Sequence, residues 1–247
     1  TDEKMPTGGD STLDPEDLAG HRAYHRFSPR IGIGFPVSDR TVCHANYGVF
    51  YQLPNLENLY VGYEFLEYWM PRGQDYAFGN PNLTPEETTA YELGVTRQIG
   101  VNGRLSVTGF RKSIRDLIQV AALPSKPAKY IYYRNQDFAT VKGLEAELSL
   151  RRTERAAARL SYSLQFADGT GSNANSHGRI AWGFLPGVSE PPKITAPLDF
   201  DQRHKLSVIL DYRFGAEDGP LWRGRRPLAG AGVNVLVSAG SGFPYTP

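Results

Sequence analysis

The residues whose types could do chemistry are scattered along this chain of 247 residues. His21 and His25 have a spacing found in metal sites, but they lie in a polar segment with no strong third ligand nearby. Ser161, Ser163 and Ser207 alternate with apolar residues, and no G-x-S-x-G elbow presents a serine as a nucleophile. We therefore expect no catalytic residues, no metal site and no cofactor, and the chain is not predicted to be an enzyme.

Charge, hydropathy and cysteine content exclude further classes of protein. The 27 basic and 26 acidic residues leave a net charge of +1, too little for binding nucleic acid by neutralising phosphates. The mean hydropathy is −0.41, and no apolar run approaches the roughly 18 residues of a helical membrane span. Cys43 is the single cysteine, which excludes an internal disulfide and a zinc site with paired thiolates.

The elements that carry these residues follow a period of two. Between Arg155 and Phe166, one face holds Ala156, Ala158, Leu160, Tyr162, Leu164 and Phe166, and the other holds Ala157, Arg159, Ser161, Ser163 and Gln165. The segment from Lys205 to Phe214 alternates in the same way, with Ile209 as the exception on the polar side. Such alternation predicts β-strands with one apolar and one polar face.

Weaker copies of this alternation bring the prediction to about eight strands, each near the length of a membrane-spanning strand. They lie at Ile31–Phe35, Cys43–Tyr51, Tyr91–Val95, Arg104–Ile118, Leu144–Leu150 and Val233–Val237. Connections 37–40, 100–103 and 152–155 are short, whereas 52–85, 119–137 and 167–199 are long. Short and long connections alternate along the chain as far as the segment Gly215–Leu228.

This regular alternation favours an outer-membrane β-barrel, in which short periplasmic turns and long extracellular loops lie at opposite ends. The long loops also exceed the roughly 12–15 residues that compact domains usually tolerate without secondary structure. In such a barrel the apolar faces meet lipid and the polar faces line a lumen. Alternating strands with one buried face also describe a soluble antiparallel sheet, so that alternative stays open on the pattern alone.

Several motifs resemble one known family. The segment Gly79–Glu86, of sequence GNPNLTPE, followed by AYELG at 90–94, resembles a signature of TonB-dependent outer-membrane receptors. Further matches in the same order are FSPRIG at 27–32, YGVFYQLP at 47–54, FRKSIRDLI at 110–118, VKGLEAE at 141–147, DQRHKL at 201–206 and SGFPYTP at 241–247. The resemblance covers nearly all of residues 27–247, and the style of the long loops resembles receptors of Bacteroidota-like bacteria.

The resemblance implies an all-β fold, namely an antiparallel transmembrane β-barrel segment that supplies about eight strands of a larger, roughly 22-stranded barrel. We expect residues 1–26 to form an extracellular loop or a disordered lead-in, and residues 27–247 to form the barrel segment. The family's plug domain, TonB box, export signal and C-terminal strands are not recognisable in the chain. We therefore interpret the chain as an interior part of a barrel.

The function that the resemblance implies is TonB-energised import of a scarce nutrient across the outer membrane of a Gram-negative cell. The nutrient would be a siderophore or other metal chelate, or an oligosaccharide. The implied partners are outer-membrane lipid, the plug domain of the same full-length chain, the TonB-ExbB-ExbD complex acting through the N-terminal part, and a surface lipoprotein; nucleic acid is not expected. Two alternatives are a passive or structural outer-membrane β-barrel without energised transport, and a soluble β-sheet binding protein.

Two groups of side chains are the predicted binding surfaces. Aromatic residues of the long loops suit sugar rings or apolar siderophore faces, although packing of the loops onto themselves would account for any one of them equally well. These candidates for ligand capture are Tyr60, Tyr63, Tyr68, Trp69, Tyr76, Phe78 and Trp182. The candidates that would face the lumen, and there hydrogen-bond a plug or one another, are Glu92, Glu145, Glu147, Arg159, Asp211 and Arg213.

Overall fold

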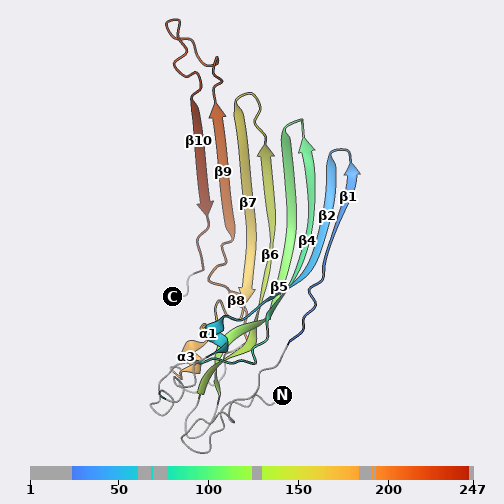
Figure 1. Cartoon of the computed structure of the whole chain (residues 1–247), viewed down its shortest axis with the longest axis vertical. Coiled ribbons are helices and arrows are strands. Elements are labelled where there is room, and N and C mark those ends of the chain that lie inside the picture. The colour runs from blue at the N-terminus through green and yellow to red at the C-terminus, as the bar shows by residue number, and fades with distance from the viewer. Residues whose placement is uncertain are drawn as a thin grey trace, which may run out of the picture.

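A single ten-stranded β-sheet forms the body of the protein (Figure 1). The computed structural model describes residues 24–60, 68, 77–123, 130–183, 191 and 193–244. The long strands are β1 (Arg30–Ser38), β2 (Thr41–Gln52), β4 (Glu86–Ile99), β5 (Gly103–Leu123), β6 (Tyr130–Leu150), β7 (Ala156–Gly169), β9 (His204–Arg213) and β10 (Gly232–Gly240). They pair antiparallel in chain order, which confirms the all-β antiparallel prediction and each strand inferred from alternation.

Two very short strands and two short helices complete the described secondary structure. Strand β3 (Ala77–Phe78) pairs in parallel with β6, and strand β8 (Ala196–Pro197) pairs antiparallel with β7. The helices are α1 (Leu56–Leu59) and α3 (Gly178–Ala181). No helix in the described part of the chain is long and apolar enough to span a membrane.

The register gives the sheet two chemically different faces. One row across it consists of Ser106, Glu147, Ser161, Ser207 and Ser238. The adjacent row consists of Leu105, Leu148, Leu160, Val208 and Val237. Directly opposed residues of antiparallel strands project to the same side, and successive residues of one strand project to opposite sides. These two rows therefore belong to a polar face and an apolar face, the names used below.

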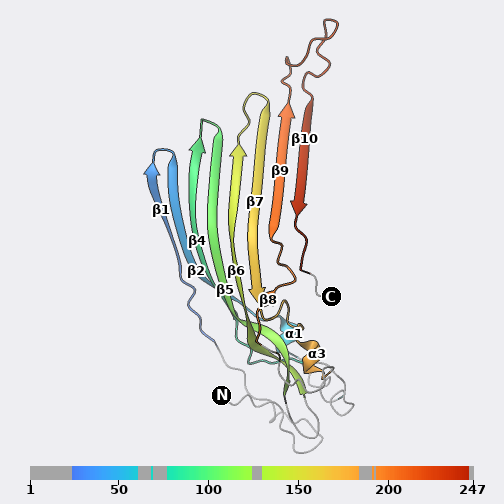
Figure 2. The same ribbon diagram turned by 180° about the vertical axis from the view of Figure 1, so that it is seen from behind.

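The hairpin turns and the long connections lie at opposite ends of the sheet (Figures 1 and 2). The turn end holds the connections between β1 and β2, β4 and β5, β6 and β7, and the longer connection between β9 and β10. In the β4–β5 turn, Gly100 has a φ of +59°, a conformation that glycine adopts without steric cost. The loop end holds both helices and β8, and β3 pairs there with Ile131 and Tyr132 near the start of β6. This arrangement confirms that the short turns lie at the opposite end of the sheet from connections 52–85 and 167–199, whereas the predicted long connection 119–137 is reduced to residues 124–129.

Strands β5 and β6 are much longer than predicted, at 21 residues each. The sequence suggested a loop over 119–137, whereas β5 continues to Leu123 and β6 resumes at Tyr130. The alternation is obscured there because the register shifts between Ile114 and Ile118, and Asp116 has a φ of 60°. Such bulges place an extra residue in one strand, so a strict period of two no longer identifies it.

The buried apolar residues gather at the loop end. One cluster joins Ala139, Val141, Ala167 and Leu198, and another joins Val120, Ile131 and Ala181. Away from these clusters the apolar face is uncovered, with Ile33 and Leu93 exposing 66% and 67% of their surface. Large contiguous apolar surfaces mark contact with another protein or with lipid. The apolar face of the sheet must therefore be covered by another protein or by lipid.

The Asp201 side chain stabilises the end of β7 that lies at the loop end of the sheet. This side chain is 1% exposed. One carboxylate oxygen accepts a hydrogen bond from the amide of Ala167 at 2.9 Å, and the other pairs with Nε of Arg203 at 2.8 Å. In the sequence DQRHKL, the buried acceptor Asp201 therefore stands two residues before Arg203, whose positive charge compensates that of the carboxylate.

We predict that Asp201→Ala makes this end of β7 open more often. The amide of Ala167 would lose its acceptor, and a buried unsatisfied donor costs about 1–3 kcal/mol. In the full-length protein, hydrogen exchange at Ala167 should accelerate by about tenfold or more. Asp199→Ala removes an exposed carboxylate from the same segment and serves as the control, with unchanged exchange expected. Equal exchange rates in the two variants would contradict this role for Asp201.

Candidate functional site

The segment Gly79–Glu86 attaches the chain before β4 to the extended part of β6. The amide nitrogen of the Asn80 side chain, a residue only 5% exposed, donates to the carbonyl of Tyr133 at 3.0 Å. The backbone amide of Thr84 donates to Oδ1 of Asn135 at 2.8 Å, and Nδ2 of Asn135 donates back to the Thr84 carbonyl at 2.9 Å. The GNPNLTPE motif thus has a structural role as the anchor of a long connection.

A buried polar network holds the segment between β7 and β8 against β5 and β6. Gln119 and Asp137 are 1% and 6% exposed, and Nε2 of Gln119 donates to Oδ2 of Asp137 at 3.0 Å. The same amide group donates to the carbonyl of Asn173 at 2.8 Å. The Nε2 atom of His177 lies 3.1 Å from Oδ2 of Asp137. Sequence spacing gives no sign of this network because its members come from three separate segments.

A cavity of about 240 Å³ adjoins this network at the loop end. Its polar lining includes Gln52, Asn55, Asn58, Glu86, Gln119 and Asp137. Burial raises the pKa of the Glu86 carboxyl, and the Ile118 amide, which donates to it at 3.1 Å, partly opposes that rise. The lining residues are rich in amide and carboxyl groups and contain no lysine or arginine. Such a cavity can accept hydrogen bonds from hydroxyl or amine groups of a small ligand.

The aromatic residues proposed for ligand capture fall into three groups. Tyr60 and Tyr68 are exposed, at 64% and 52% of their surface. Phe78 is buried, and Trp182 packs against the cluster of Val120, Ile131 and Ala181. The remaining candidates, Tyr63, Trp69 and Tyr76, lie outside the described residues. Among the described candidates, Tyr60 and Tyr68 are therefore the exposed ones, whereas Phe78 and Trp182 lie against the protein.

The register places every candidate for the lumen on the polar face. Glu92 opposes Asn46, Glu145 opposes Ser163, Glu147 opposes Ser161, Arg159 opposes Ser149, Asp211 opposes Asn234, and Arg213 opposes Gly232. These side chains are spread over several strands rather than gathered at one point. The polar face is therefore an extended wall of hydrogen-bonding groups and not a compact reaction centre.

Several charges on this wall are paired. Nη2 of Arg104 on β5 lies 2.8 Å from Oε1 of Glu147 on β6. Asp211 contacts Arg152 and lies 3.2 Å from Nη2 of Arg213. Exposed pairs of this kind each stabilise a protein by about 1 kcal/mol or less. Their main effect is to balance charge along the wall and to favour one strand register.

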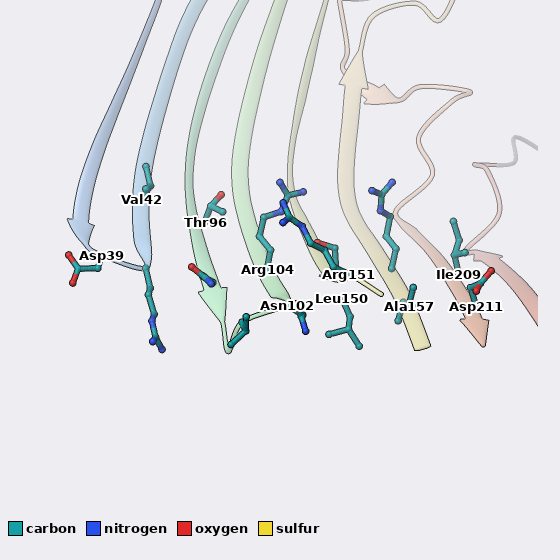
Figure 3. Close-up of a pocket in the computed structure, with 17 residues that line it drawn as sticks. Asp39, Val42, Thr96, Asn102, Arg104, Leu150, Arg151, Ala157, Ile209 and Asp211 are labelled. Atoms are coloured by element: carbon teal, nitrogen blue, oxygen red, sulfur yellow. The ribbon is translucent and has the colours of Figure 1, made fainter. Parts of the chain in front are cut away.

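A hollow of about 790 Å³ lies at the turn end and is lined largely by residues of the polar face (Figure 3). Its charged lining consists of Arg40, Arg104, Arg151, Arg159, Asp39 and Asp211. The basic residues outnumber the acidic ones, so the hollow favours an acidic or hydrogen-bond-accepting surface. The sequence placed Arg40 in a short connection and Arg104 and Arg159 on predicted strands, but it did not indicate that the three would line one hollow.

Comparison with known proteins gives the family. The family model "TonB dependent receptor-like, beta-barrel" matches residues 6–246. The alcaligin outer-membrane receptor FauA of Bordetella pertussis is 16% identical, with a TM-score of 0.51 over 90% of this chain and 30% of that one. The outer-membrane transporter YddB of Escherichia coli is 12% identical, with a TM-score of 0.53 over 77% of this chain and 27% of that one.

The chain belongs to the TonB-dependent receptor β-barrel family, whose members reside in the outer membrane. It spans less than a third of the length of these two solved structures, and its sheet is not closed into a barrel. The family resemblance and the barrel-segment interpretation are thereby confirmed. The similarity to Bacteroidota-like receptors stays a prediction.

We predict that Asp137→Ala loosens the segment that contains Asn173 and His177. The substitution removes the acceptor shared by Gln119 and His177, so local opening should become about tenfold more frequent or more. Trypsin cleavage after the exposed Arg179 reports that opening. Its rate should rise by a similar factor in the full-length protein.

Glu145→Ala is the matched control for this substitution. It removes a carboxylate from the same strand, at a side chain that forms no hydrogen bond or ion pair with another described residue. Its cleavage rate should equal that of the unsubstituted protein. Equal rates in all three proteins would show that Asp137 does not hold the segment.

Proposed function

We propose that the full-length protein imports a scarce nutrient across the outer membrane, energised by the TonB-ExbB-ExbD complex. The nutrient is a siderophore or other metal chelate, or an oligosaccharide. The observation that carries the proposal is the two-faced sheet itself, apolar and uncovered on one face and charge-balanced on the other, in a chain of the TonB-dependent receptor family. This arrangement suits a wall between lipid and a water-filled interior.

In this proposal the apolar face meets outer-membrane lipid and the polar face lines the lumen. Glu92, Glu145, Glu147, Arg159, Asp211 and Arg213 then face the plug domain of the same full-length chain. The basic hollow at the turn end supports that contact, because its arginines can donate hydrogen bonds to carbonyl and carboxylate groups of a polypeptide. The energising complex acts through the N-terminal part of the full-length chain, and a surface lipoprotein would deliver an oligosaccharide.

The loop end is the proposed site of ligand capture. The β5–β6 extension carries the cavity of about 240 Å³ and the anchored connections, so ligand groups would meet a surface held by strands. Exposed Tyr60 and Tyr68 supply amphipathic rings for a sugar or an apolar siderophore face. The structural alternative for the whole protein is a passive barrel, which would need neither a plug nor an energising complex.

Uptake measurements with and without the energising complex test this function. The full-length gene is expressed in cells with and without a functional TonB-ExbB-ExbD complex, with ferric siderophores and oligosaccharides supplied separately as the limiting nutrient. We expect high-affinity uptake of one class, and its loss when the complex is absent. Full uptake without the complex would identify a passive barrel instead.

We predict that Tyr60→Ala and Phe78→Ala have different consequences. Tyr60→Ala removes an exposed ring, so the nutrient concentration at half-saturation of uptake should rise about tenfold. This factor corresponds to the free energy of one stacking contact. Phe78→Ala removes a buried ring and should lower stability by about 3–5 kcal/mol. Unfolding curves and uptake curves of both variants separate the two effects. An unchanged uptake curve for the Tyr60 variant would exclude this ring from ligand capture.

A further inference from the structure

Two cations face each other on the apolar face. Arg111 on β5 and Lys142 on β6 are directly opposed in the register, and both side chains are exposed. Like charges in this position destabilise a sheet. Asp168, on the same face, lies one diagonal step from Lys142, and no ion pair among the described residues joins it to either cation. The sheet thus holds two directly opposed cations, joined to no acidic side chain among the described residues, on a largely apolar face.

The cation pair marks one edge of the apolar belt. From Gly103 to Arg111 the strand has about nine residues, close to the roughly 9–11 with which a tilted strand crosses the apolar band. Tyr91 and Tyr47 continue the row of Arg111, with ring centroids 5.2 Å apart. Tyrosines are typical of the level at which lipid headgroups begin. The pair therefore lies at headgroup level, on the side of the loop end.

An apolar groove of about 870 Å³ leads away from this pair. Its lining includes Ile33, Leu93, Leu144, Leu164 and Phe166, together with Gly109 and both cations. A Cβ atom at Gly109 would meet nothing closer than 3.9 Å, and its φ is not positive. Neither packing nor backbone conformation requires glycine there. The glycine therefore leaves open space in the groove that a larger side chain would fill.

We propose that this surface binds one phosphorylated lipid of the outer leaflet. The lipid phosphate lies between the Arg111 guanidinium and the Lys142 ammonium, and an acyl chain occupies the groove at Gly109. A guanidinium can form paired hydrogen bonds to phosphate oxygens, and both side chains can reach up to headgroup level. The proposal rests on the proposed function in one respect, namely that the apolar face meets lipid.

The observations favour a lipid over other occupants of the groove. Free phosphate would use the cations but leave the groove empty. A second copy of the sheet would bring the same cations and no complementary acidic partner from this row. A lipid with a phosphate head and acyl chains satisfies the charge and the apolar space together, so the proposal commits to that chemistry.

Binding of purified lipids to the full-length receptor in detergent tests the proposal. Lipid A, dephosphorylated lipid A and inorganic phosphate are titrated separately, and bound lipid is counted by native mass spectrometry. Lipid A should bind, and its dephosphorylated form should bind about thirtyfold more weakly. Binding of lipid A to the double variant Arg111→Gln/Lys142→Gln should be weakened by the same factor. Inorganic phosphate should not displace lipid A. Equal binding of the two lipids, or displacement by phosphate at equal concentration, would overturn the proposal.

Further variants separate the two halves of the site. Gly109→Leu fills the groove without removing charge and should weaken lipid A binding by about tenfold. Arg97→Gln removes an exposed cation from the same face near the turn end, and Gly34→Leu enlarges a glycine of the polar face with open space beside it. Both controls should bind lipid A normally. If either control variant bound lipid A as weakly as the site variants do, the weaker binding would be a general effect on the barrel and not a property of the site.

The same variants distinguish this proposal from the proposed function. Energised uptake should persist at half or more of its normal rate in Gly109→Leu, because the groove lies on the face away from the lumen. Unaltered lipid A binding in that variant and in the double cation variant would overturn the lipid site and leave nutrient import intact. Selective lipid A binding in a receptor without any energised uptake would support the lipid site and overturn the import proposal.

Discussion

Backbone hydrogen bonding is the constraint on which the rest of the structure depends. In a bilayer no water is available to backbone amides and carbonyls, so each strand must find its partners in its neighbours. The ladder from β1 to β10 meets that requirement without interruption. Only the outer sides of β1 and β10 lack a partner strand in the described sheet, which agrees with the chain covering less than a third of its solved relatives.

Because side chains alternate along each strand, the hydrogen-bonded sheet has one polar face and one apolar face. Shifting any pair by one residue would move Leu160 to the polar face and Ser161 to the apolar face. Ion pairs between strands, such as Arg104 with Glu147, favour the observed register. Charge is thus concentrated on one face, and among the few charged residues of the other face Arg111 and Lys142 are directly opposed.

The sequence predicts this architecture well because alternation and turn chemistry are local. The existence of every long strand, the separation of the short turns from connections 52–85 and 167–199, and the face of each lumen candidate follow from parity and spacing. The ends of β5 and β6 do not, because the bulge at Asp116 breaks the parity that identifies a strand. The contact of Gln119 with His177 is equally hidden, because 58 residues separate two groups that only the folded chain brings together.

The extension of β5 and β6 gives the described parts of the long connections strands on which to rest at the proposed capture site. Connections of this length have many conformations, and a ligand that had to order them would lose affinity. Here the described parts of two connections are held against β6 through Asn80, Thr84 and Asp137. The same strands continue into the polar face, so the proposed capture site and the proposed lumen wall share one hydrogen-bonded element. Under the proposed function, the described loop-end segments are thus positioned by the sheet before any ligand binds.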